Sequence, residues 1–375
     1  MGMIGGGIDS FIGDVHRKAA AMDGMIELVC GAFSSSEGKS KRSGQALYLP
    51  ENRCYGNFEE MFIEEKDRQV EERMDFVSIV TPNHLHFAPA KMALENGFHV
   101  VCDKPMTLTV EEAEELQALA STKGLLFALT HNYTGHPMVK QARAMIRNNE
   151  LGKIRKIQVQ YLQGWLTTSV EKTGHKQALW RVDPSKSGLG GALGDIGTHA
   201  ENLVEYITGL ALTEVAADLG KFGEGRALDD DGNILLRLEN GAKGTMSFSQ
   251  IAVGEENNLA IRVYGDKGSL SWHQENPNQL LVKWLDKSAQ TFTPNSNNLH
   301  KQALAASRIP AGHPEGYLEA FANIYKNFAI HLNATSQNLK IEDSDYPTAS
   351  DGVRGIKFIH AVVASDKNNS TWAKV

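Results

Sequence analysis

The stretch Phe76-Val77-Ser78-Ile79-Val80-Thr81-Pro82-Asn83-His84-Leu85-His86 contains a short apolar run that ends in polar residues, with a helical pattern over 84–96. The same alternation fills the first third of the chain. Further apolar runs cover residues 1–4, 26–33, 99–102 and 126–130, and further helical patterns cover 11–22, 57–72 and 110–122. Strands that alternate with helices indicate a doubly wound parallel sheet, which binds ligands beyond the carboxyl ends of its strands. We predict an α/β Rossmann domain over residues 1–133.

Length and composition limit the classes of function. A chain of 375 residues favours two domains. A formal net charge of −7 without a basic cluster argues against nucleic acid as a partner. No apolar run has the length of a membrane span, and no signal peptide is evident, so we expect a cytoplasmic protein without a membrane partner. Three widely spaced cysteines give neither a disulfide framework nor a metal-ligand pattern.

A glycine turn follows the first apolar run. Gly5, Gly6 and Gly7 occur at the end of the expected strand, and five residues separate Gly7 from Gly13. A backbone without Cβ atoms lets a pyrophosphate approach a helix N-terminus, although the spacing is irregular and the alternative is a flexible turn. Only four residues precede Gly5, so the first strand is short. A start assigned too late, or missing residues, would explain this.

Two other strand ends carry polar groups. Thr81, Pro82, Asn83 and His86 are placed to contact a cofactor, and the alternative for Asn83 is a helix cap. After the next strand comes Asp103-Lys104-Pro105. A lysine directly after a buried strand needs a partner for its ammonium group. Pairing with Asp103 is the weaker alternative, because adjacent side chains on an extended chain point apart.

The segment Gly190-Gly191-Ala192-Leu193-Gly194-Asp195-Ile196-Gly197-Thr198-His199 opens a helix that we expect to end near Gly209. Residues four apart lie on one helical face, so Asp195 and His199 are expected to point the same way. Histidine has an unperturbed pKa near neutrality and suits proton abstraction from an alcohol. The alternative is a solvated polar face.

The pattern changes after residue 133. A helix is predicted over 136–149, followed by alternating segments that indicate an antiparallel sheet, and residues 134–375 form the expected α+β domain. These segments cover residues 154–162, 213–222, 231–238, 243–251, 259–265 and 268–273. Helices are expected over 318–328 and 345–364, the latter packing on the first domain. The run Asp229-Asp230-Asp231 is interpreted as a turn with capping carboxylates, and we expect no metal site.

The four motifs, in order along the chain, resemble the glucose–fructose oxidoreductase/inositol dehydrogenase family, often called Gfo/Idh/MocA. They are the glycine turn with His16, Thr81-Pro82-Asn83-His84, Asp103-Lys104-Pro105, and the Gly-Gly segment with Asp195 and His199. The resemblance spans nearly the whole chain. It implies an open, largely antiparallel sheet in the second domain, with one face paired to another subunit in a homodimer or homotetramer. It also implies a cis Lys104–Pro105 bond.

The resemblance further implies an NAD(P)-dependent oxidoreductase acting on a secondary alcohol of a sugar, inositol or sugar derivative. His199 is then the general base, Lys104 stabilises negative charge on the substrate oxygen, and Asp195 binds a neighbouring hydroxyl. Lys104 and His199 are expected to meet across one cleft. Two alternatives are a glycosidase-like enzyme that oxidises its substrate transiently and a non-catalytic dinucleotide sensor. The presence of both Lys104 and His199 disfavours the sensor.

The expected ribose site lacks the acidic residue that usually selects NAD. The second strand is followed by Ser34, Ser35 and Ser36, with Lys39 close behind. Hydroxyl groups and a lysine suit a 2′-phosphate, so the sequence favours NADP(H) over NAD(H). The alternative is a solvated loop indifferent to the 2′ group.

Several residues of the second domain are candidates for the substrate pocket. Tryptophan stacks on the apolar face of a sugar ring, and arginine and amide groups bind hydroxyl groups. The candidates, besides Asp195 and His199, are Asn132, Tyr133, Trp165, Arg181 and His313. For each of them, packing or capping is the alternative, and His313 is the weakest candidate.

Overall fold

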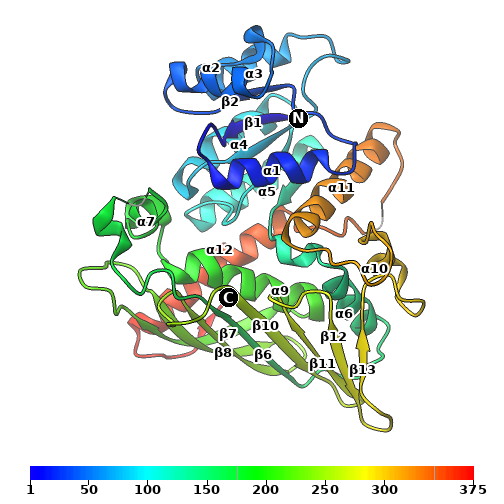
Figure 1. The fold of residues 1–375 in the computed structure, drawn as a ribbon. Helices are drawn as coiled ribbons and strands as arrows, with labels where there is room; N and C mark the ends of the chain where they lie inside the picture. Colours follow the sequence, from blue (N-terminus) through cyan, green and yellow to red (C-terminus); the bar gives the residue numbers. More distant parts are fainter. Residues whose placement is uncertain (175, 342) are drawn as a thin grey trace. The chain divides into compact units, whose positions relative to one another are not determined.

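The structure, a computed structural model, describes residues 1–174, 176–341 and 343–375 (Figure 1). The chain divides into two compact units, which are Met1–His131 with Phe321–Val353, and Asn132–Ala320 with Arg354–Val375. The sequence predicts a boundary at residue 133 and a return of the chain to the first domain only for the helix over 345–364. The first unit instead includes residues 321–353.

The first unit contains a five-stranded sheet in the order β2-β1-β3-β4-β5, with every neighbouring pair parallel. Its strands are β1 (Gly2–Gly5), β2 (Cys30–Ala32), β3 (Phe76–Val80), β4 (His99–Cys102) and β5 (Phe127–Leu129). The chain begins with β1, adds β2 on one side of it, and then adds β3, β4 and β5 in turn on the other side. Right-handed crossovers therefore place helices on both faces. The predicted doubly wound sheet is confirmed.

Several helices of this unit begin at a residue whose side chain accepts a capping hydrogen bond. Ser10 and Thr109 accept hydrogen bonds from Gly13 N and Glu112 N, which start two of the helices. The helices are α1 (Phe11–Ala21), α2 (Glu37–Ala46), α3 (Phe58–Lys66), α4 (Phe87–Glu95) and α5 (Val110–Lys123), together with most of α11 (Tyr317–Ser336) and the start of α12 (Ala349–Lys367). The rings of His16 and Phe321 lie 5.0 Å apart, so α11 packs beside α1.

Helix α2 is missing from the sequence prediction. Its residues are mostly polar, and it buries Ser40, Ser43 and Gly44 rather than an apolar stripe. Hydrogen bonds hold it instead, since Ser40 Oγ donates to Tyr55 O and accepts from Phe33 N. A periodicity of apolar residues cannot reveal a helix of this kind.

The second unit is built on a nine-stranded sheet in the order β13-β12-β11-β10-β6-β9-β8-β7-β14. Its strands are β6 (Lys156–Leu162), β7 (Leu212–Gly220), β8 (Asp231–Leu238), β9 (Lys243–Ser249), β10 (Asn258–Tyr264), β11 (Gly268–His273), β12 (Leu280–Trp284), β13 (Gln290–Phe292) and β14 (Ala373–Lys374). The pairing is antiparallel apart from β6 with β9, which run parallel. The largely antiparallel sheet is confirmed, while the central parallel pair and the strands after residue 273 were not expected.

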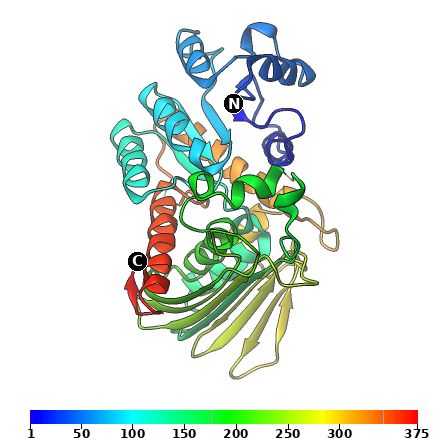
Figure 2. The ribbon, with the colours of Figure 1, turned by 90° about the vertical axis from the view of Figure 1, so that its left-hand side faces the viewer.

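One face of this sheet carries helices, and the other is open (Figure 2). Helix α6 (Pro137–Arg147) contacts β11 and β12, and α9 (Thr198–Thr208) contacts β6 and β10. Along β8, buried side chains alternate with more exposed ones, as expected for a sheet that packs on one side. Helix α9 ends at Gly209, which has φ +66°, as the sequence predicts.

The stretch before Asp195 is partly helical. It contains α7 (Lys176–Arg181) and α8 (Pro184–Ser187), and α10 (Lys301–Ala305) follows later in the unit. A π-helical turn, Leu193–Gly197, then leads into α9. Across the residues that the structure describes, no helix combines the length and the apolar character of a membrane span.

Candidate functional site

The predicted cofactor residues of the first unit follow strands β1, β3 and β4, whose carboxyl ends lie at one edge of the parallel sheet. Gly5 and Gly6 have φ values of +80° and +69°, which favour glycine. A Cβ atom on Gly13 would lie 2.3 Å from Gly6 Cα, and one on Gly7 would lie 2.8 Å from Phe33 O. The turn is therefore a cradle of bare backbone ahead of α1. It fits the pyrophosphate of a dinucleotide.

The Lys104 turn is held by its own aspartate. Asp103 Oδ1 accepts hydrogen bonds from Lys104 N (2.9 Å) and Thr130 Oγ1 (2.8 Å). Burial opposes ionisation of Asp103, yet the nearby His16 and Lys104 and the Thr130 hydroxyl keep its pKa below the ordinary value. The Lys104–Pro105 bond is cis, as expected. Asp103 thus fixes the backbone from which the Lys104 side chain extends.

His86 connects two of these loops. Its ring nitrogens lie 2.8 Å from Pro105 O and 2.8 Å from Thr81 O, and its side chain is buried. Burial lowers the pKa of His86. From the sequence, His86 is predicted to contact the cofactor. These contacts favour an indirect role in which His86 ties the Thr81 loop to the Lys104 turn.

The serines after β2 form a largely exposed bend that leads into α2. Ser36 is the N-cap residue of α2, and Ser34 Oγ accepts from Ser36 N. Ser35 is exposed, and Lys39 is partly exposed. On the same helix, Lys41 Nζ lies 2.7 Å from Glu37 Oε1, so this cation is paired with a carboxylate.

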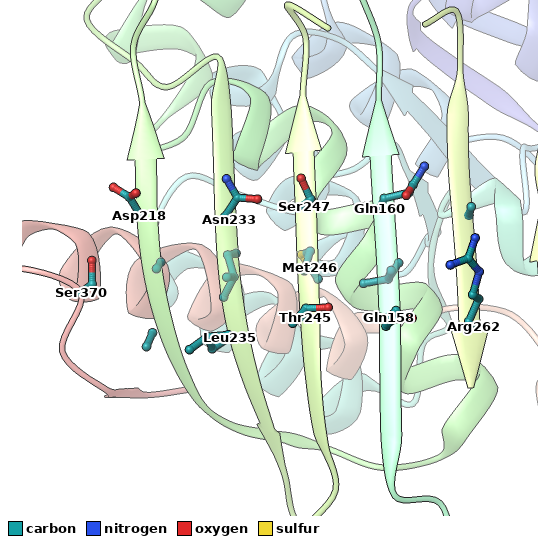
Figure 3. A pocket seen from close by; sticks show the side chains of 15 residues that line it. Gln158, Gln160, Asp218, Asn233, Leu235, Thr245, Met246, Ser247, Arg262 and Ser370 are labelled. Carbon is teal, nitrogen blue, oxygen red and sulfur yellow. The ribbon is translucent and has the colours of Figure 1, made fainter. Parts of the chain in front are cut away.

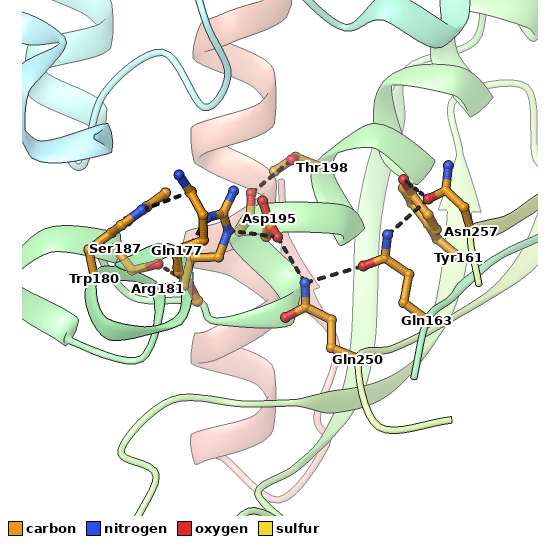
Figure 4. Close-up of polar contacts among 12 residues, drawn as sticks. Tyr161, Gln163, Gln177, Trp180, Arg181, Ser187, Asp195, Thr198, Gln250 and Asn257 are labelled. Carbon is orange, nitrogen blue, oxygen red and sulfur yellow. Dashed lines mark hydrogen bonds and ion pairs between the residues drawn. The ribbon is translucent and has the colours of Figure 1, made fainter. Parts of the chain in front are cut away.

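In the second unit, Asp195 is held by two donors (Figure 4). Arg181 Nε donates to Asp195 Oδ2 at 3.1 Å, and Gln250 Nε2 donates to the same oxygen at 2.8 Å. The guanidinium of Arg181 lies 4.3 Å from the Trp180 ring centroid and 6.0 Å from that of Trp165. The carboxylate is thus partly buried and held in orientation by an ion pair and an amide hydrogen bond.

Asp195 and His199 do not share a regular α-helix, which corrects the prediction. Asp195 belongs to the π-helical turn, and His199 lies in the first turn of α9. A π-turn changes the angle between residues four apart, and such turns occur often at functional sites. The His199 ring lies 4.9 Å from the Tyr133 ring and 6.2 Å from the Tyr161 ring.

Beside His199, three side chains form a closed ring of hydrogen bonds. Tyr161 OH donates to Asn257 Oδ1 (2.7 Å), Asn257 Nδ2 donates to Tyr133 OH (3.3 Å), and the two tyrosine hydroxyls lie 2.5 Å apart. The directions are consistent only if Tyr133 donates to Tyr161. Burial raises the pKa of both phenols, so both keep their protons at neutral pH.

Gln163 links this ring to Asp195. Its Nε2 donates to Asn257 Oδ1 at 2.8 Å, and its Oε1 lies 3.5 Å from Gln250 Nε2. A continuous chain of polar side chains therefore runs from Arg181 through Asp195 to Tyr133, and Figure 4 shows most of it. We call it the polar chain; its members are Arg181, Asp195, Gln250, Gln163, Asn257, Tyr161 and Tyr133.

Comparison with known proteins decides the family. The family model for an oxidoreductase family with an NAD-binding Rossmann fold matches residues 1–131, and the model for the GFO/IDH/MocA C-terminal domain matches residues 139–271. The uncharacterized oxidoreductase YfiI of Bacillus subtilis is 36% identical over 377 residues, which cover 99% of this chain and 95% of that protein. The chain belongs to the Gfo/Idh/MocA family.

Two further relatives are informative. An inositol dehydrogenase homolog from Azotobacter vinelandii, solved with NAD+, superposes with a TM-score of 0.94 at 36% identity, covering 100% of this chain and 96% of that one. Its complex with NADH and myo-inositol gives a TM-score of 0.91 over 100% and 97% of the two chains. Levoglucosan dehydrogenase of Pseudarthrobacter phenanthrenivorans is 30% identical over 235 residues, or 57% of this chain and 59% of that protein. This Gfo/Idh/MocA protein is an NAD-binding oxidoreductase.

Only some of the remaining predicted substrate-pocket residues lie in or near the polar chain. Tyr133 and Arg181 are in the polar chain, and Trp165 lies near Arg181. Asn132 is 2% exposed, and its Nδ2 has no hydrogen-bond partner among the described residues. His313 lies on an exposed loop with Nδ1 3.1 Å from Pro310 O, and no hydrogen bond between described residues joins it to the polar chain.

Four residues of the polar chain were not predicted from the sequence: Tyr161, Gln163, Gln250 and Asn257. These residues occur at the end of β6, after β9 and before β10, which are neighbours in the sheet. Recognising them as one group requires the strand order, including the parallel β6–β9 pair. The available signal was weak: a glutamine or asparagine at each of three strand ends.

Proposed function

We propose that the protein is an NAD(H)-dependent dehydrogenase that interconverts a secondary alcohol and a ketone on a sugar, an inositol or a sugar derivative. The observation that carries this proposal is the polar chain, which fixes Asp195 at one end and contacts the His199 ring at the other. Amide, phenol and carboxylate groups in a row suit a ring with several hydroxyl groups. Relatives that bind myo-inositol or are named for levoglucosan support the same substrate class.

The proposed chemistry assigns one task to each catalytic residue. His199 accepts the proton of the reacting hydroxyl group. Lys104 donates a hydrogen bond to the same oxygen and stabilises the negative charge that develops there. Asp195, oriented by Arg181 and Gln250, binds an adjacent hydroxyl group and fixes the reacting carbon in register. The bound nicotinamide supplies the hydride acceptor.

Asn132 is assigned to substrate binding on separate grounds. A buried amide donor without a partner costs free energy on the order of 1–3 kcal/mol, which a ligand oxygen would recover. Trp165 and Tyr133 are proposed to border the sugar or inositol ring of the bound substrate. His313 remains the weakest member of this set, because it lies on an exposed loop.

The glycine turn, Thr81, Pro82, Asn83 and Asp103 are proposed to hold the dinucleotide. For its 2′ position we propose NAD(H) as the working cofactor, because Lys41 is paired with Glu37 and the Azotobacter relative binds NAD+. The hydroxyls of Ser34 and Ser35 and the ammonium of Lys39 favour NADP(H) instead. KM values for both cofactors, measured with wild-type and Lys39→Ala protein, decide between them.

The open face of the large sheet is proposed to pair with a second copy of this chain. It contains a hollow of about 480 Å³. Figure 3 shows polar side chains of β6, β8 and β9 along the hollow, with Asp218 of β7 on one side and Arg262 of β10 on the other, and apolar side chains such as Leu235 and Met246 between them. Leu235 on this face is 52% exposed, which is high for a leucine in the middle of a strand. Sedimentation of wild-type protein as a monomer would contradict the proposal, and Leu235→Arg is expected to shift the equilibrium toward monomer.

The test of function is a screen of inositols, aldoses, glycosides and keto-sugars with both cofactors, followed by the absorbance of the reduced nicotinamide. Net oxidation or reduction of a polyol supports the proposal. Product formation without net change in the cofactor would favour transient oxidation, as in a glycosidase-like enzyme. Cofactor binding without turnover of any compound would favour a dinucleotide sensor. The cytoplasmic location is also a proposal, tested by cell fractionation.

A further inference from the structure

The glycine turn before Asp195 lacks a local cap. The first amides of a helix need acceptors, which usually come from a Ser, Thr, Asp or Asn just before it. Here Gly190, Gly191 and Ala192 carry no side-chain acceptor, and no side chain caps the π-turn locally. The acceptor comes from a residue far along the chain.

Asp229, in the loop between β7 and β8, receives three consecutive amides of this turn. Its Oδ1 accepts from Gly191 N at 2.7 Å, its Oδ2 accepts from Leu193 N at 2.7 Å, and its main-chain oxygen accepts from Ala192 N at 2.9 Å. The side chain is 5% exposed. A Cβ atom on Gly191 would lie 2.2 Å from Asp229 O, so only glycine permits this approach.

We call these three hydrogen bonds to Asp229 the clamp. It acts directly on the segment that carries Asp195 and His199. Asp195 N donates to Gly191 O at 3.0 Å, so the position of Gly191 determines where the π-turn begins. Gln250 N donates to the main-chain oxygen of residue 230 at 2.8 Å, a contact that does not involve the Asp230 side chain. Asp195 is thus anchored by Asp229, and the glutamine that orients it is held by the adjacent main chain.

We propose that Asp229 is a positioning residue that fixes the π-turn and thereby the orientation of Asp195 and His199 toward the substrate. This role rests on the proposed function. Two opposing effects set its protonation. Burial raises the pKa of Asp229 to about 6, while the two amide hydrogen bonds favour the ionised form. The carboxylate is therefore ionised at neutral pH and can accept both amides.

The test compares Asp229→Asn and Asp229→Ala with Asp230→Asn. The control removes a neighbouring buried carboxylate that accepts Phe222 N and Gly223 N and pairs with Arg226, none of which is in the glycine turn. Asp229→Asn retains one acceptor oxygen and Asp229→Ala retains none. We expect kcat to fall about tenfold in the first and about a hundredfold in the second, with the dissociation constant for NADH unchanged. Asp230→Asn is expected to lower the melting temperature but keep kcat.

Hydrogen exchange measures the clamp independently of turnover. Faster exchange of the Gly191 and Leu193 amides in both Asp229 variants, and not in Asp230→Asn, supports the inference. Wild-type kcat in folded Asp229→Asn and Asp229→Ala overturns it, as does unchanged exchange at the two amides. If wild-type protein turns over no polyol, the proposed function fails, and the exchange experiment still decides whether Asp229 holds the turn. If Asp229→Ala does not fold, Asp229→Asn and Gly191→Ala provide the comparison.

Discussion

Gln250 Nε2 lies 2.8 Å from Asp195 Oδ2, the oxygen that also accepts Arg181 Nε. Gln250 is 1% exposed and follows β9, so a fixed part of the sheet orients a carboxylate in the helical segment. Gln250 is an uncharged donor, whereas Arg181 forms an ion pair with the same carboxylate. The arrangement leads to the first prediction.

Replacing Gln250 with Leu removes this donor while keeping a side chain of similar size. A hydrogen bond to a charged group contributes about 1.5–3 kcal/mol, so kcat/KM is expected to fall roughly tenfold to a hundredfold. Steady-state kinetics with the best polyol measure the effect. Gln279→Leu is the matched control, because Gln279 is exposed on a turn of the same unit. Unchanged kcat/KM in Gln250→Leu would remove Gln250 from the account.

The hydrogen-bonded ring beside His199 is tested by Tyr161→Phe. This change deletes the hydroxyl that donates to Asn257 and accepts from Tyr133. Because the ring is proposed to bind substrate hydroxyls, KM should rise about tenfold, equivalent to about 1.4 kcal/mol, with a smaller change in kcat. Tyr264→Phe is the control, since among the described residues its hydroxyl has one long hydrogen bond, to Gln158 at 3.4 Å. Equal KM values for the two variants would contradict the assignment.

Cofactor binding is tested at the glycine cradle. In Gly13→Ala, the new Cβ would lie 2.3 Å from Gly6 Cα, a main-chain contact that cannot be relieved by rotating a side chain. We expect the dissociation constant for NADH to rise at least about tenfold, or about 1.4 kcal/mol. The control is Gly38→Ala in α2, where the nearest atom is 3.5 Å away and the helix should gain about 1 kcal/mol. Normal NADH affinity in folded Gly13→Ala would contradict the proposed cradle.

Stability is expected to depend on pH through buried neutral histidines. Burial lowers the pKa of His136 from 6.5 to about 3, and its Nε2 has no hydrogen-bond partner in the described part of the chain. Between these values the unfolded chain binds the proton and the folded chain does not, so the free energy of unfolding falls as the pH decreases below 6.5. The loss attributable to this residue between pH 7 and pH 5 is about 2 kcal/mol.

His136→Phe removes this titration and keeps a ring next to Tyr133 and Trp272. Denaturant unfolding at pH 7 and pH 5 is expected to show a smaller difference in the variant than in the wild type. His313→Gln should retain the wild-type difference, because His313 is exposed. A variant as acid-sensitive as the wild type would show that His136 is not the cause.

Much of the fold follows from sequence patterns, and the exceptions have physical causes. The strands of the parallel sheet are short and apolar, and Gly209 and Thr109 mark helix ends, so these features are predictable. Helix α2 escapes detection because serine hydroxyls, not apolar groups, hold it. The parallel β6–β9 pair cannot be inferred from alternation, which is the same in both directions of pairing.

For the site, the sequence identifies residues with reactive side chains but not those that orient them. Lys104, Asp195 and His199 occur in recognisable motifs. Asp229 is predicted to be a capping carboxylate of its own turn. The amides that donate to it, Gly191 N and Leu193 N, lie 38 and 36 residues earlier in the chain. Gln250 likewise has a common side chain at a strand end. Both acquire their roles only through contacts between distant segments.

The central claim is that His199 takes a proton from a polyol hydroxyl while hydride passes to bound NAD+. The most direct measurement is the single-turnover rate of nicotinamide reduction with myo-inositol or the best polyol of the screen, in wild-type and His199→Ala protein saturated with NAD+. We predict reduction by the wild type and a rate lowered at least about a hundredfold in the variant, with NAD+ affinity unchanged. Equal rates in the two proteins would contradict the account.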